Sequence, residues 1–91
     1  MIESLEKIFT IINNEIGNEC SLWDKNIIKK VILPEMEDLY AHFVKGEKYF
    51  KYGKRQRMLE STYILTDSLE KLADTLLGHQ ILVIQHIYDK I

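Results

Sequence analysis

The residues best suited to chemistry lie in one short segment, positions 45–57, which combines positive charge with aromatic rings. Six lysines and arginines stand there against one acid, Glu47, whereas the other 78 residues carry six bases and thirteen acids. Cations that contact phosphates and flat rings that stack on bases are what single-stranded nucleic acid binding requires. The same side chains suit an acidic protein surface or an anionic membrane surface. We predict the partner-binding residues to be Tyr49, Phe50, Tyr52, Lys54, Arg55 and Arg57.

An ordinary structural explanation competes with this one. Charge at a corner between helices is commonly just solvated, and the rings would then tuck into the end of the helical bundle. The acidic balance of the rest of the chain repels phosphates, which favours a protein partner over a nucleic acid.

Metal-ligating residue types occur, but not in a complete set. Glu35, Asp38 and His42 share one helical face at spacings of i, i+3 and i+7, and His79 and His86 share another. A di-iron carboxylate bundle requires glutamates from four helices and two Glu-x-x-His pairs, and that pattern does not occur in the sequence. We therefore expect no metal and no cofactor, and we expect the two later histidines to be partly exposed.

The chain offers no recognisable catalytic group. Cys20 precedes an expected helix start, where backbone amides favour a thiolate. A lone cysteine beside Leu22 and Trp23 is more typical of a small packing residue, with the indole anchoring the loop to the core. The sequence contains no glycine-rich phosphate loop, nucleophile elbow or triad spacing, so we expect no enzymatic activity.

Composition bounds the fold class. The 91 residues include one proline and four glycines, with 46% hydrophobic and 29% charged residues. This predicts a single all-α domain over residues 1–91, because the turns of a β fold have few places to form. One cysteine allows no internal disulfide, and no window approaches the roughly 20 apolar residues that cross a bilayer. We expect a cytoplasmic protein without a membrane span.

Apolar spacing predicts a first helix from Ile2 to Ile16, closed by Gly17. A second helix should begin within 21–24, with Ser21 in a capping box, and end at Gly46. Its apolar stripe is expected to be Ile28, Ile32, Met36, Leu39 and Phe43. Pro34 falls inside the stripe without shifting its phase. Two arrangements fit, a continuous helix kinked at Pro34 or a new helix that starts there, and the unbroken phase favours the kink.

A third long helix is expected from Lys54 onward. Apolar spacings of four and three predict a packing seam at Met58, Thr62, Leu65, Leu69, Leu72 and Leu76. The seam suits either the inside of a bundle, which we favour, or a dimer contact. Beyond Gly78 the apolar face shifts by one residue, to Leu77, Ile81, Ile84, Tyr88 and Ile91. We predict a bend at Gly78 and a shorter carboxy-terminal helix.

The expected architecture is thus a small antiparallel bundle of three long helices and one shorter helix, with bends at Pro34 and Gly78. Four apolar residues off the seam, Tyr63, Ile64, Leu77 and Leu82, provide more apolar surface than one seam uses. We therefore expect a non-enzymatic interaction module that binds a protein partner and forms a homodimer. The alternative is a nucleic-acid-binding or regulatory protein that uses residues 45–57.

Overall fold

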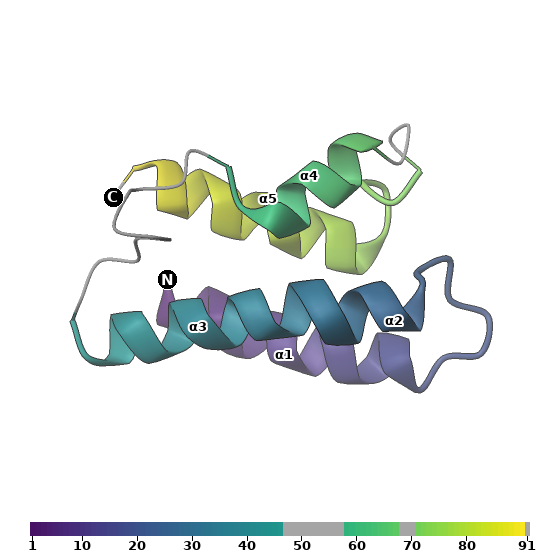
Figure 1. Ribbon diagram of the computed structural model, residues 1–91, viewed down its shortest axis with the longest axis horizontal. Coiled ribbons are helices and arrows are strands. Elements are labelled where there is room, and N and C mark those ends of the chain that lie inside the picture. Colours follow the sequence, from purple (N-terminus) through teal and green to yellow (C-terminus); the bar gives the residue numbers. More distant parts are fainter. Residues whose placement is uncertain (47–57, 68–70, 91) are drawn as a thin grey trace.

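The computed structural model describes residues 1–46, 58–67 and 71–90, and this part of the chain is mostly helical and contains no strand (Figure 1). The expected fold class is therefore confirmed at this level. The helices are α1 (Ile2–Ile16), α2 (Lys25–Ile27), the π-helical turn η1 (Ile28–Ile32), α3 (Leu33–Val44), α4 (Glu60–Asp67) and α5 (Leu76–Asp89). Figure 1 shows α1 beside the continuous rod formed by α2, η1 and α3, with α4 and α5 lying together on one side of this pair.

Helix α1 spans the predicted range. Leu5, Ile8 and Ile12, which follow one another at spacings of three and four, are fully buried, and Ile11 is buried as well. Gly17 is the carboxy-terminal cap: its amide donates to the carbonyl of Asn13, and the amide of Asn18 donates to the carbonyl of Glu15. The three-and-four spacing therefore predicted both the helix and the face that it buries.

The loop after α1 is held at both ends by side chains. Ser21 donates its hydroxyl hydrogen to the Glu15 carboxylate and accepts from the Trp23 amide. Asp24, not Ser21, caps the next helix, because its carboxylate accepts from the Asn26 amide at 2.8 Å. The capping box at Ser21 was therefore a wrong prediction, although the predicted start of the helix was right.

The helical backbone continues through Pro34, as the unbroken apolar phase indicated. Immediately before the proline it widens into η1, where the Leu33 amide donates to the Ile28 carbonyl five residues earlier. Proline has no amide hydrogen, and its ring collides with the carbonyl four residues earlier in an ordinary α-helix. The wider turn accommodates the ring without ending the helix. Ile28, Ile32, Met36 and Leu39 stay fully buried on one side of this rod.

The third predicted helix is wrong in its extent. Helix α4 has eight residues, and residues 71–75 form turns before α5 begins, so no single helix reaches Leu76. Of the predicted seam, Thr62 and Leu65 are buried and Leu72 packs partly buried against the core, whereas Leu69 lies outside the described residues. Leu76 is 64% exposed, and the shifted set of Leu77, Ile81, Ile84 and Tyr88 forms the buried face of α5.

The break lies ahead of Gly78 because Thr75 starts α5. The Thr75 hydroxyl accepts from the Gly78 amide at 3.0 Å and donates to the Leu72 carbonyl at 2.6 Å. It also accepts from the Trp23 indole at 2.9 Å, which anchors the loop after α1 as expected. Gly78 lies within the first turn of α5 and does not bend it.

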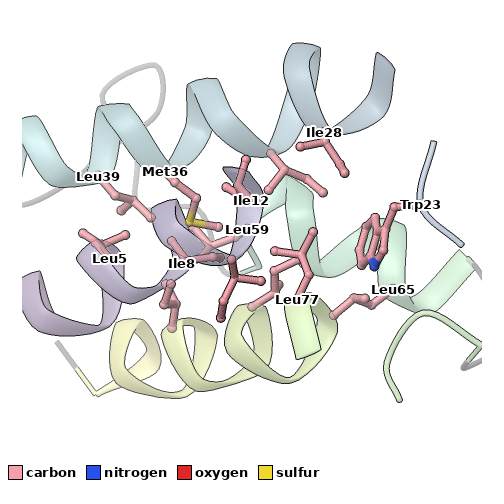
Figure 2. Close-up of a cluster of buried hydrophobic side chains, with 14 of the residues drawn as sticks. Leu5, Ile8, Ile12, Trp23, Ile28, Met36, Leu39, Leu59, Leu65 and Leu77 are labelled. Atoms are coloured by element: carbon pink, nitrogen blue, oxygen red, sulfur yellow. The ribbon is translucent and has the colours of Figure 1, made fainter. Parts of the chain in front are cut away.

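One apolar core joins all of these elements. Figure 2 shows Leu5, Ile8 and Ile12 of α1 meeting Met36 and Leu39 from α3, with Leu59 and Leu77 closing the other side. Trp23 and Leu65 extend the cluster at one end. Fully burying a side chain of this size contributes roughly 1.5–3 kcal/mol.

Buried polar side chains determine where α4 sits on this core. The Glu35 carboxylate accepts from the amides of Glu60 and Ser61 at 2.8 and 2.9 Å, and from the Ser61 hydroxyl at 2.7 Å. From α5, the side-chain oxygen of Gln85 accepts from the Leu59 amide and the Thr62 hydroxyl. A carboxylate at the first amides of a helix satisfies donors that have no partner within the helix.

Replacing Gly78 with alanine should lower the free energy of unfolding by about 1–3 kcal/mol, the usual cost of overpacking. A Cβ there would lie 2.0 Å from the Leu72 carbonyl oxygen and 2.9 Å from the Ala73 Cα, and both belong to the backbone. Gly17→Ala is the control, since its Cβ would meet ordinary contacts of 3.6 Å or more. Urea denaturation measures both variants. Equal midpoints for the two variants would contradict this account of the α5 start.

Replacing Glu35 with glutamine should destabilise the fold by about 1–3 kcal/mol. The two carboxylate oxygens of Glu35 accept from the backbone amides of Glu60 and Ser61, and glutamine replaces one of these oxygens with an NH2 group that cannot accept. Glu3→Gln, an exposed acid in the first turn of α1, is the matched control. Thermal unfolding followed by circular dichroism compares the two. The role of Glu35 would be refuted by a variant that unfolds at the wild-type temperature.

Candidate functional site

The six predicted partner-binding residues, Tyr49, Phe50, Tyr52, Lys54, Arg55 and Arg57, lie outside the described residues. The described part reaches the beginning of the basic segment. Helix α3 ends at Val44, Lys45 is exposed, and Gly46 has a φ of +73°, a conformation that suits glycine and ends the helix as predicted. The charge pattern of this segment therefore remains an argument from sequence.

Two members of the possible metal-ligand set on the second helix, Glu35 and His42, make hydrogen bonds within the fold. Glu35 is buried against the start of α4, where its oxygens receive the hydrogen bonds given above. His42 is within 2.8 Å of the Asp38 backbone carbonyl through Nδ1. Within residues 1–46, 58–67 and 71–90, no group of three or more histidine, cysteine or acidic side chains is arranged to hold a metal ion.

Cys20 and the two later histidines all lie at the surface. Cys20 is a free, exposed thiol in the loop after α1, and its amide donates to the Asn18 side chain at 3.0 Å. It does not pack into the core, which corrects the expectation of a packing role. His79 and His86 are exposed on α5, as expected.

The outer face of α5 is the main apolar surface that the described residues leave uncovered. Leu76, Leu82 and Val83 are 64%, 44% and 45% exposed. Their spacing places them with His79 and His86 on one side of the helix, opposite the buried Leu77 face. We call these five residues the α5 outer face.

This face carries no formal charge when its histidines are neutral. From Thr75 to Tyr88 the sequence contains no aspartate, glutamate, lysine or arginine. Charged residues flank the stretch, with exposed Asp74 before the helix and exposed Asp89 and Lys90 at its end. When a partner covers such a surface, apolar area is buried and no charged group has to lose its hydration.

Sequence reasoning located this surface only in part. Of the off-seam apolar residues that it identified, Tyr63 and Leu82 are 51% and 44% exposed, whereas Leu77 is fully buried in the core. It placed Leu76 on the buried seam and did not single out Val83. The one-residue shift in apolar spacing was the available signal. If Leu77 faces the core, the helical period places Leu76 and Val83 on the outer side.

Two further apolar surfaces lie away from α5. Leu22 is 74% exposed and, with Lys71, Leu72 and Asp74, borders an open depression of about 510 Å³. A second depression, of about 380 Å³, lies between α1 and α3. None of the helices in the described ranges combines the length and apolarity that crossing a bilayer requires.

Comparisons with known proteins do not identify a family for this chain. Searches against protein-family models, curated proteins and solved structures find no significant match.

Proposed function

We propose that this protein is a non-enzymatic interaction module that self-associates through the α5 outer face. The observation that carries the proposal is the exposure of Leu76, Leu82 and Val83 on one side of a helix whose other side is fully committed to the core. Burying this apolar surface in an interface would remove it from water, which is the main driving force of association.

Charge favours a second copy as the occupant. A twofold interface opposes a surface to itself, so any charged group near the axis meets its own like charge. The α5 outer face avoids this cost, because residues 75–88 carry no acid, lysine or arginine. An anionic membrane is less suitable, since amphipathic helices that bind one carry lysines and arginines.

The proposed location is the cytoplasm. Cys20 is an exposed thiol with no partner cysteine in the sequence, and a reducing compartment keeps such a thiol free.

Self-association should be lost when a charge is placed on this face. Leu76→Glu and Val83→Glu should each weaken the dimer by about tenfold or more, because each buries an unpaired carboxylate from both copies. Sedimentation velocity across the micromolar range measures the effect, with circular dichroism confirming that the fold is intact.

The matched control is Val44→Glu, which adds the same charge at a residue that is 57% exposed at the end of α3. It should dimerise like the wild type. A wild-type chain that stays monomeric throughout, or a dimer that tolerates both α5 variants, would refute this interface.

The basic segment supports a second proposal from a different class, binding of single-stranded nucleic acid. It is favoured by the concentration of six bases and three aromatic residues within positions 45–57. The acidic balance elsewhere makes this the weaker candidate.

For this second proposal, affinity for a labelled single-stranded oligonucleotide should fall steeply with salt, and the slope should decrease by about 0.7 for each phosphate contact removed. Fluorescence anisotropy measures both quantities. The test variant replaces four bases of the segment with glutamine: Lys51, Lys54, Arg55 and Arg57. The control makes the same net change at four exposed lysines: Lys7, Lys29, Lys30 and Lys71. If the two variants lose affinity for the oligonucleotide equally, the effect is one of net charge alone and the proposed site is rejected.

A further inference from the structure

A depression of about 380 Å³ lies between α1 and α3 and is lined by Phe9, Asn13, Leu33, Glu37 and Tyr40. Phe9 and Asn13 are four residues apart on α1. Leu33, Glu37 and Tyr40 follow one another at spacings of four and three on α3, so each set lies along one side of its helix. The volume is within the range of small-molecule sites, toward its lower end.

Two aromatic rings form one wall of this depression and are held in place. The ring centroids of Phe9 and Tyr40 lie 5.7 Å apart, with their planes at 72°, an edge-to-face contact. Both residues are half-buried and pack against the core. The face of an aromatic ring carries negative potential and attracts cations within about 6 Å of its centroid.

The carboxylate of Glu37 gives the depression the same sign preference. Glu37 is the only formally charged residue among the five, and Asn13 adds a side-chain carbonyl that can accept hydrogen bonds. Among the residues that the structure describes, no lysine, arginine or histidine lines the depression. An incoming cation would therefore meet a carboxylate and two ring systems without a competing positive group in the lining.

We infer that this depression binds an organic cation, a guanidinium or a quaternary ammonium group, beside Glu37 and against the rings of Phe9 and Tyr40. An organic cation fits better than a metal ion, because metal ions require several hard or soft ligands and the lining offers one carboxylate among largely apolar side chains. The inference is independent of self-association, since the depression includes no residue of α5.

The cation has two possible sources, an arginine side chain of a partner protein or a free amine, and two probes distinguish them. N-acetylarginine methylamide represents the side chain, and choline represents the free amine. The neutral isostere 3,3-dimethylbutan-1-ol matches the shape of choline without its charge. Titration followed by nuclear magnetic resonance of the Phe9 and Tyr40 ring signals reports binding at this site.

At least one cation should bind saturably, and the neutral isostere should bind at least about threefold more weakly than choline if choline is the better ligand. Glu37→Gln should weaken cation binding by about threefold or more, and Tyr40→Leu by about two- to fivefold. The controls are Glu19→Gln and Tyr63→Leu, an exposed acid and an exposed tyrosine outside the depression. Both should bind like the wild type.

Glu37 is exposed, so its variant keeps the fold and the test does not depend on a destabilised protein. Stronger binding of the arginine probe would identify a partner side chain as the source, and stronger binding of choline a free amine. The inference is overturned if neither cation shifts the ring signals, or if Glu37→Gln binds both as tightly as the wild type.

Discussion

The hydroxyl of Thr75 determines where α5 begins, and the orientation of the whole carboxy-terminal helix depends on that point. It accepts hydrogen bonds from the Trp23 indole and the Gly78 amide and donates one to the Leu72 carbonyl, which uses its full hydrogen-bonding capacity. Because the helix starts there, Leu77 enters the core and Leu76 faces outward. One threonine thus connects the loop after α1 to the surface that we propose for association.

Helix α4 illustrates how a short element depends on its surroundings. Its eight residues are fewer than the roughly 12–15 that an isolated helix needs to be stable in water. Glu35 satisfies the first amides of α4 from one side, while Gln85 holds Leu59 and Thr62 from the other. These contacts give the apolar core a single arrangement, because any other placement of α4 would leave buried donors without acceptors.

Local patterns predicted those parts of the fold whose causes are local. Apolar spacing found α1 and the rod through Pro34, and the anchoring role of Trp23 followed from its size and position. The start of α5 at Thr75 was missed because one of its contacts comes from far along the chain, the hydrogen bond from the Trp23 indole. The depression beside Glu37 was missed for the same reason, since two helices form it together. The predicted site within 45–57 lies outside the described residues.

The widened turn at Ile28–Ile32 also keeps two halves of a rod in register. Four residues of an ordinary α-helix overshoot a full turn by about 40°, so successive four-residue steps carry an apolar stripe gradually around the axis. A turn that takes more residues per revolution reverses part of this drift, which brings Ile28 and Met36 back to the same side. One residue more or fewer in that turn rotates everything after it by about 100°, Glu35 included. The wider turn therefore accommodates the proline and also keeps the buried residues before and after it on the same side of the helix.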